Sequence, residues 1–378
     1  MKTGSAIAKA GTVRASSMVQ LGLFEILGDT RQTQTIDLLD IAPRYVFYTD
    51  RDARENGKYL SIINREFSHM GRMFSLQLRP ARIIRDGSEI DVYPGEREQL
   101  VEEVVRKIAV GKNRLMLEGD DVVLQCTMYE LREELTRRRH TLSFAELKEA
   151  LTILHLAPIF ITATKSDHGE DDTIVTIRGS IFPVFDTSDK GDENGTIIRF
   201  NPILAKAIKH MKFRPMSYET TMRLKSPISR WLFKKLNQIG LFEDHTIQVH
   251  EIRATDIQRD CGLPAVANTP RQMKQITAAI QTLQDQGVIE SFTQNDEMEG
   301  RKRTDIIYMV RMSEAFMAEM KASQVRAVED AAFLENERAK KGSPTGKFVS
   351  TSSETLETIR RKRVAKRAEA AEPAPRFC

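Results

Sequence analysis

The stretch Thr269-Pro-Arg-Gln-Met-Lys-Gln-Ile-Thr-Ala-Ala-Ile-Gln-Thr-Leu-Gln-Asp-Gln-Gly287 decides how this chain is interpreted. A proline at the first helical position loses no hydrogen bond, and a glycine after the last turn ends a helix. Apolar side chains recur every three or four residues, so they share one helical face. The stretch therefore predicts an amphipathic helix over 270–286, with its apolar stripe at Met273, Ile276, Ile280 and Leu283.

The segments on either side of this helix predict further helices and strands in a definite order along the chain. Ser226-Pro227 is a second helix-start pair, and Gly262-Leu263-Pro264 ends a short helix. The predicted elements are, in order, a helix over 227–239, a strand at 248–249, a helix over 255–261, the helix over 270–286, and strands over 288–292 and 305–311 joined by a polar loop. A helix-turn-helix followed by a β-hairpin is the order of a winged helix.

A similar order is found upstream. A short strand at 122–125 precedes a helix over 128–138, which Thr127 and Glu130 begin as a capping box. A second helix over 143–155 and further strands follow, at 158–164, 173–177, 181–185 and 196–200. The first half therefore has the element order of a diverged copy of the second half.

The sequence thus predicts an α+β protein made of two tandem winged-helix domains. Residues 1–40 form a flexible arm, and residues 41–200 form the first winged-helix domain, with an extra β-hairpin turning at Asp86-Gly87. Residues 201–312 form the second domain. A charged helix and a disordered basic tail occupy 313–378, which is rich in Gly, Ser, Pro and Thr before its arginine-rich end.

The 378 residues carry a formal charge of only +4, but the charge is unevenly distributed. Residues 1–200 carry −4, residues 201–312 carry +5, residues 313–337 carry −4 and residues 338–378 carry +7. The two basic segments are the electrostatic candidates for contact with nucleic acid. The chain has no apolar run long enough to span a membrane and no secretory signal, and its three cysteines are too few and too scattered for a disulfide framework or a zinc site. A bacterial cytoplasmic setting is expected.

The polar face of the helix over 270–286 is the first candidate for reading DNA. The second helix of a helix-turn-helix enters the major groove, where arginine suits guanine and glutamine suits adenine. The loop after it can meet phosphates, and Ser226 and Arg230 stand at the start of a helix where a phosphate could bind. The candidate DNA contacts in this half are Arg271, Gln272, Lys274, Gln275, Thr277, Arg301, Lys302, Arg303, Ser226 and Arg230.

The first half offers a weaker set of DNA contacts. Arg137, Arg138 and Arg139 lie at the turn between its two helices, and Lys148 lies on the second helix. The same helix also exposes Glu146 and Glu149, which DNA would repel. Dimerisation or another protein interaction therefore remains as good an interpretation of this half as groove reading.

The arm contains a peptide of a different kind. Gln20-Leu21-Gly22-Leu23-Phe24 resembles the pentapeptide Gln-Leu-Ser/Asp-Leu-Phe with which bacterial replication proteins bind the sliding clamp of the replicative polymerase. Its chemistry suits such a tether, because the glutamine amide anchors the peptide while the leucines and the phenylalanine fill an apolar pocket.

Catalytic signatures are missing from the sequence. The seven histidines never occur as His-x-His, the metal-dependent nicking motif of rolling-circle initiators. The segment Gly342–Phe348 is one residue short of a Walker loop and lacks its Ser/Thr. Neither an enzymatic activity nor a metal or cofactor is expected.

Several short pieces together resemble the TrfA-type replication initiators of plasmids, within the tandem winged-helix Rep family. The match runs with gaps from about Gln20 to about Met312. Its pieces are Gln20–Phe24, Met128–Leu131, Lys225-Ser226-Pro227 with Arg230 and Phe233, Cys261-Gly262, and Gly287–Glu290.

The resemblance implies that monomers bind directly repeated sites, called iterons, in the double-stranded DNA of a replication origin. It also implies help in opening adjacent AT-rich DNA, and recruitment of the host sliding clamp, initiator and replicative helicase. Homodimers in equilibrium with the monomers would be inactive. A winged-helix transcriptional repressor is the alternative, since it would share the reading helix but would not need Gln20–Phe24.

Overall fold

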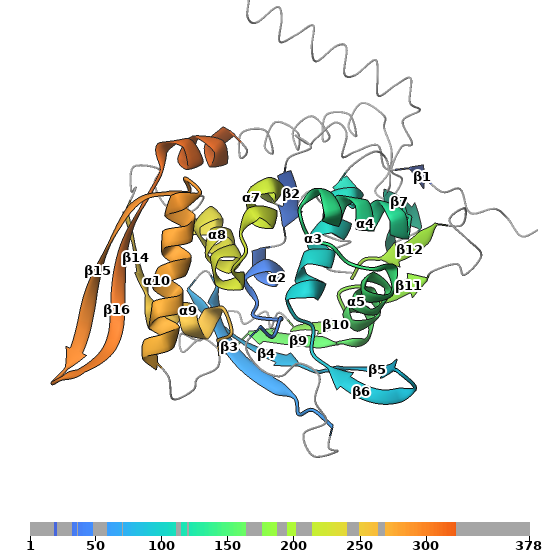
Figure 1. The fold of residues 1–378 in the computed structure, drawn as a ribbon, viewed down its shortest axis with the longest axis horizontal. Coiled ribbons are helices and arrows are strands. Elements are labelled where there is room, and N and C mark those ends of the chain that lie inside the picture. The colour runs from blue at the N-terminus through green and yellow to red at the C-terminus, as the bar shows by residue number, and fades with distance from the viewer. Residues whose placement is uncertain are drawn as a thin grey trace, which may run out of the picture.

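The computed structural model describes residues 19–20, 32–35, 37–47, 59–69, 71–110, 115–118, 121–163, 176–186, 195–201, 214–239, 249–263 and 269–322. Within these ranges the chain is an α+β protein in which every strand pairing is antiparallel (Figure 1). Residues 202–213 lie outside the described residues, as does most of the predicted charged helix and basic tail, from residue 323 onward.

The C-terminal half has the element order predicted for a winged helix. Its elements are α8 (Pro227–Ile239), β14 (Val249–Arg253), α9 (Ala254–Asp260), α10 (Thr269–Asp285), β15 (Ile289–Glu299) and β16 (Lys302–Met312). The three strands form one sheet in the order β14-β16-β15. Met273, Ile276, Ile280 and Leu283 are all buried, which confirms the apolar stripe of α10.

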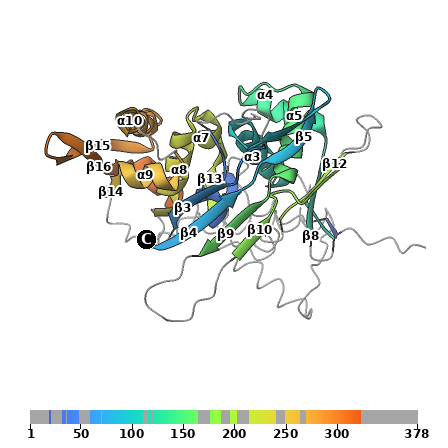
Figure 2. The same ribbon diagram turned by 90° about the horizontal axis from the view of Figure 1, so that it is seen from below.

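The polar loop predicted for 293–304 is instead part of a long β-hairpin, which we call the wing. The pairing of β15 with β16 continues to Glu299 and Lys302, and the chain turns at Gly300 with a φ of 63°. The prediction was wrong because it relied on alternation of apolar and polar residues. The wing projects away from the body and is exposed along nearly all of β15, so no face of that strand needs apolar side chains (Figures 1 and 2).

The N-terminal half contains the predicted helix pair. Its elements include α3 (Glu96–Val110), β7 (Leu115–Glu118), β8 (Asp121–Cys126), α4 (Met128–Arg137), α5 (Phe144–Leu156), β9 (Ile159–Ala163), β10 (Thr176–Gly179), β11 (Val184–Asp186) and β12 (Thr196–Arg199). The capping box of Thr127 and Glu130 is confirmed, and Ser143 with Glu146 forms a second one before α5.

The strands of this half pair differently from those of a simple winged helix. Strand β8 lies in a five-stranded sheet of order β1-β7-β8-β12-β11, in which β1 is Val19–Gln20. Strands β9 and β10 lie instead in a four-stranded sheet of order β10-β9-β4-β3. Two extra strands, β3 (Ile63–His69) and β4 (Arg72–Leu78), contribute to the difference: β4 pairs with β9, while β8 pairs with β7 and β12 instead of with the β9-β10 hairpin.

The predicted hairpin at Asp86-Gly87 is present as β5 (Ala81–Arg85) and β6 (Ser88–Val92). Asp86 and Gly87 have φ values of 51° and 75°, the left-handed pair that a tight hairpin turn requires. The inner face of the hairpin packs on α5 in a small apolar cluster of its own, formed by Ala81, Ile83, Val92, Ile153 and Ala157.

The end of the predicted arm is part of the folded body. Strand β2 (Gln32–Thr35) pairs with β13 (Arg214–Ser217), just before the short helix α7 (Tyr218–Arg223). Helix α2 (Asp37–Ile41) follows β2 in the chain, and its Leu39 and Ile41 are buried in the main core. The expected boundary at residue 40 therefore divides a helix that both halves use.

Helix α3 of the first half packs against α2 and α8 through a buried set of charges. Arg106 donates to Asp40 at 2.6 Å and lies 2.5 Å from Glu102, while Lys234 of α8 donates to Glu103 at 2.5 Å. Burial alone would raise the pKa of Glu102, but Arg106 and Arg44 outweigh it and hold that pKa well below its ordinary value. Because each buried cation faces a carboxylate, the two halves are joined by a charge-balanced contact.

Candidate nucleic-acid interface

Helix α10 presents one continuous exposed stripe to solvent. Arg271, Lys274, Ala278 and Gln281 are all exposed, and their spacing of three, four and three residues places them on one side of the helix. The stripe lies opposite the buried residues that hold α10 on the core. Ala278 and Gln281 were not among the predicted contacts, although continuing the period of Arg271 and Lys274 would have found them.

The remaining predicted contacts on α10 have more limited roles. Gln272 and Gln275 are half-buried, and the Gln272 Oε1 accepts a hydrogen bond of 2.8 Å from Gln258 of α9. Thr277 faces the wing, because its Oγ1 lies 3.0 Å from the Met273 carbonyl and 2.7 Å from the Tyr308 hydroxyl. Thr277 is half-buried and its hydroxyl is already engaged by Met273 and Tyr308, so its predicted contact with DNA stays a prediction.

The turn after α9 is fitted closely against the first half. Gly262 has a φ of 77°, and a Cβ there would lie 2.7 Å from the Arg65 Nη1 and 2.8 Å from the Pro43 Cβ. Next to it, the Asp260 carboxylate accepts a hydrogen bond of 3.0 Å from the backbone N–H of Ser68 in β3. The first helix of the helix-turn-helix is thus held by the sheet of the N-terminal half.

Two of the three predicted cations of the wing form no ion pair with the described residues. Arg301 and Lys302 lie at the tip, and both are exposed. Arg303 is also exposed, but it forms an ion pair of 2.9 Å with Asp296 on the facing strand. Only Arg301 and Lys302 therefore remain available for phosphates without breaking a contact.

The two predicted contacts at the start of α8 differ from each other. Ser226 is half-buried and its Oγ accepts a long hydrogen bond of 3.5 Å from the Ser229 N–H, as a helix cap does. Arg230 has no exposed surface, and it donates to Gln99 at 3.1 Å, to the Leu224 carbonyl at 2.7 Å and to Glu96 at 2.5 Å. The prediction that Arg230 contacts DNA is wrong here, because the guanidinium is used to join α8 to α3.

The basic residues of the first half are divided in the same way. Arg137 is exposed but paired with Glu133 at 2.5 Å, and Arg138 is paired with Glu134 at 3.1 Å and stacks on the ring of Tyr218. Arg139 is exposed at a φ of 64°, and Lys148 is exposed on α5. The helix pair therefore shows a mixed surface of charges rather than a basic one.

Of the predicted clamp peptide, the described residues include only Gln20. Gln20 belongs to β1 (Val19–Gln20), whose backbone pairs with Met116 and Leu117 of β7. Leu21, Leu23 and Phe24 lie outside the described residues.

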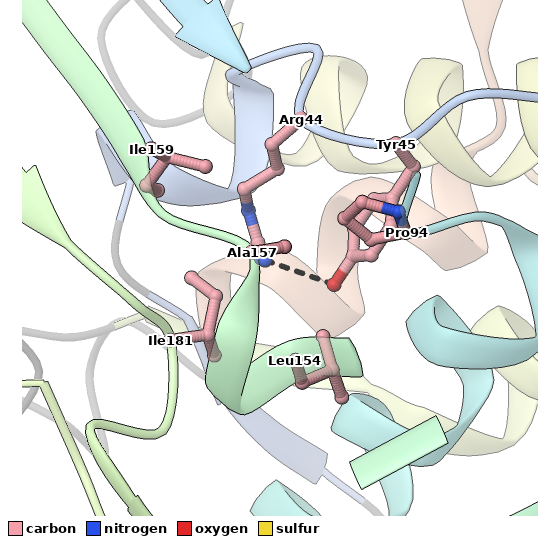
Figure 3. A pocket seen from close by; sticks show the side chains of 7 residues that line it. All are labelled: Arg44, Tyr45, Pro94, Leu154, Ala157, Ile159 and Ile181. Carbon is pink, nitrogen blue, oxygen red and sulfur yellow. Dashed lines mark hydrogen bonds between the residues drawn. The ribbon is translucent and has the colours of Figure 1, made fainter. Parts of the chain in front are cut away.

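One cavity among the described residues is too small for an organic ligand. This cavity, between Arg44, Tyr45 and Ile159, has a volume of about 10 Å³, room for roughly one water molecule (Figure 3). In the described ranges, no three His, Cys, Asp or Glu side chains come together as metal ligands would. None of the helices within those ranges has the length and apolar character needed to cross a membrane.

No family model and no curated protein sequence matches this chain. Among solved structures, it is similar to a crystal structure of domains 2 and 3 of RctB, with a TM-score of 0.46 and 8% identity over 73% of this chain and 96% of that one. A second structure of RctB domains 2–3 gives a TM-score of 0.41 and 8% identity over 75% of this chain and 98% of that one. The crystal structure of the Pi initiator protein in complex with iteron DNA gives a TM-score of 0.39 and 15% identity over 58% of this chain and 91% of that one. All three TM-scores are below 0.5, so the function of this chain is inferred below from its own residues.

Proposed function

We propose that this chain binds double-stranded DNA in a sequence-specific way, with α10 in the major groove and the tip of the wing at the phosphate backbone. The observation that carries the proposal is the exposed stripe of α10, in which Arg271 and Lys274 stand at the N-terminal end and Ala278 follows. The N-terminal residues of the second helix are those that contact base edges in helix-turn-helix proteins. A small residue at position 278 lets the helix approach the groove closely.

We further propose that the bound DNA is a replication origin with iteron repeats and that the protein is an initiator without enzymatic activity. Support comes from the sequence pieces that resemble TrfA-type initiators, above all the clamp-type peptide Gln20–Phe24. In this proposal, residues 41–200 supply dimerisation and backbone contacts, and residues 201–312 read the repeats. Host initiator, helicase and sliding clamp are the partners, and the bacterial cytoplasm is the setting.

A winged-helix transcriptional repressor remains the second candidate, because α10 and the wing would serve it equally well. The two functions differ in their need for the clamp-type peptide. Replacing Leu23 and Phe24 by alanine should abolish replication of a plasmid that carries the gene and its flanking DNA, while the affinity for that DNA stays unchanged. Plasmid copy number and DNA affinity are measured side by side.

The control for this experiment is Gly22→Ala, a change at the position of the peptide where the side chain is not an anchor. A plasmid that replicates normally with both anchors removed would contradict the use of the clamp peptide. A wild-type plasmid whose replication does not depend on the gene would contradict the initiator and favour the repressor. Loss of DNA affinity in the anchor variant would instead show that the peptide is needed for folding or for DNA binding.

A further inference from the structure

Strand β16 sends polar side chains inward to the helix-turn-helix. The first is Asp305, which is buried on the side of β16 that faces α9. Its carboxylate accepts hydrogen bonds from the Thr255 N–H at 3.1 Å and from the Thr255 hydroxyl at 2.6 Å. The N-cap residue of α9, Arg253, makes no side-chain cap of its own. Asp305 therefore caps α9 from across the sheet.

The second inward side chain is Tyr308, which is fully buried and reaches α10. The Thr277 Oγ1 lies 3.0 Å from the Met273 carbonyl and 2.7 Å from the Tyr308 hydroxyl, and either hydroxyl can be the donor in the second contact. Burial raises the pKa of Tyr308 from its ordinary value of 10.0, so its hydroxyl is protonated at neutral pH with or without this shift. The ring also packs against Phe292 of β15, with 6.4 Å between the ring centroids.

These two contacts stand at the base of the projecting part of the wing. Toward the tip from Asp305, Arg301, Lys302 and Arg303 are exposed, and on the facing strand every residue from Thr293 to Glu299 is exposed. The hairpin extends from this base away from α10 (Figures 1 and 2). One ion pair reaches the projecting part itself, from Arg253 at the start of α9 to Glu297 of β15 at 3.0 Å. The direction of the tip is therefore set by this ion pair together with the packing at the base.

We infer that Tyr308 and Asp305 are positioning residues for DNA binding: they hold the wing at a fixed offset from the exposed stripe of α10, so that Arg301 and Lys302 meet the phosphates beside the groove that α10 enters. The inference rests on the proposed binding of double-stranded DNA. A duplex is a stiff partner that helix and wing touch together, so a wing held in advance avoids the entropy cost of ordering it on binding.

The experiment is a double-mutant cycle on the full-length chain, using a duplex selected from a random pool by the wild-type protein. The tip variant R301A/K302A is measured in the wild-type background and in the Tyr308→Phe background. We expect the tip variant to lower the affinity for the duplex in the wild-type background. In the Tyr308→Phe background, the fold-loss of affinity caused by the tip variant should be about three times smaller.

Matched variants separate positioning from general loss of stability. Thr277→Val removes the same hydrogen bond from the helix side and should show the same coupling, whereas Thr277→Ser keeps the hydroxyl and should behave as the wild type. Tyr93→Phe also removes a buried tyrosine hydroxyl, which donates to the Ser61 carbonyl in the first half, and it should leave the effect of the tip variant unchanged.

Additive effects of the tip and Tyr308 changes, a tip variant that binds as the wild type does, or equal coupling for Tyr93→Phe would each overturn the inference. None of these results would contradict DNA binding itself. Failure of the wild-type protein to select any duplex would contradict the proposed function and the inference with it.

Discussion

At the scale of the residue, polar side chains of similar character have opposite roles in this chain. Arg271 and Arg230 both stand near the start of a helix in the basic half. The structure exposes Arg271 on the outer stripe of α10 and buries Arg230 completely between α8 and α3. A cation can contact phosphates or bases only from the surface, so only Arg271 remains a candidate reader.

Arg271→Ala should weaken specific binding by about 1–3 kcal/mol if the guanidinium contacts a base edge, because that is the usual cost of losing a bidentate contact. Affinity is measured on the selected duplex and on random duplex DNA at the same salt concentration. Arg311→Ala, on an exposed residue of β16 outside the stripe, serves as control. An equal loss on both DNAs would show that Arg271 contacts phosphate instead.

Arg230→Met should lower the free energy of unfolding by about 2–4 kcal/mol, because it leaves Gln99 and the Leu224 carbonyl without their buried donor. Urea unfolding measures the change. Arg271→Met is the matched variant and should stay within about 0.5 kcal/mol of the wild type, as exposed substitutions usually do. Equal stabilities for the two variants would show that the buried contacts of Arg230 contribute nothing.

At the scale of the element, the helix-turn-helix depends on its neighbours. Helix α9 is short, and it takes its cap from Asp305 of β16 and a backbone contact from β3. The turn after it has room for no side chain at Gly262. Secondary-structure patterns identify α9 and α10, but they do not reveal that a strand of the other half holds α9.

Gly262→Ala tests this close fit. The new methyl group would crowd Arg65 and Pro43 and would also force alanine to a φ of 77°, so we expect a loss of about 2–4 kcal/mol. Gly287→Ala is the matched control, because its φ is 73° and no atom lies within 4 Å of the added Cβ. Gly287→Ala should therefore lower the stability only by the cost of holding alanine at a positive φ, about 1 kcal/mol. Thermal unfolding of both variants measures the difference, and equal costs would exclude crowding at Gly262.

At the scale of the whole molecule, the two halves share one apolar core and a buried set of charges. The Trp231 indole N–H donates to the Ile41 carbonyl at 3.0 Å, and Lys234 of α8 faces Asp40 and Glu103. Such contacts pack the two halves against each other in the described ranges, although the sequence presents them as successive copies of one motif.

This set of charges gives stability a definite dependence on pH. Burial alone would raise the pKa of Asp40, but Arg106, Lys234 and Arg44 outweigh it, and the folded pKa values of Asp40 and Glu102 both lie below the ordinary values of 3.8 and 4.5. Their contribution is present above those ordinary values and is lost as the pH falls through the lower folded values. The protein should therefore lose stability steadily below about pH 4.

Glu102→Gln should remove part of this pH dependence and also lower the free energy of unfolding at pH 7 by about 3–5 kcal/mol, because Arg44 and Arg106 lose a buried partner. Urea unfolding at pH 7, 4 and 3 measures both effects. Glu133→Gln, which breaks a surface pair with Arg137, should leave the pH profile unchanged. An acid profile identical to the wild type for Glu102→Gln would assign the acid sensitivity to other carboxylates.

The sequence by itself determined the local elements of this protein and the residues that begin and end them. The capping box at Thr127, the turn at Asp86-Gly87 and the apolar stripe of α10 depend on contacts within a few residues, so periodicity and cap chemistry reveal them. Arg271 and Lys274 followed in the same way, since the outer face of a helix is fixed once its inner face is known.

Only the tertiary structure decided the use of polar residues whose partners lie far away in the chain. Arg230 bonds with Gln99, Thr277 with Tyr308 and Asp260 with Ser68, and no local pattern announces any of these pairs. The length of the wing and the pairing of β9 with β4 were decided there too, because strand partners are set by which edges meet in space. Burial turns a hydrophilic side chain from a surface contact into a structural one, and burial is a property of the assembled fold.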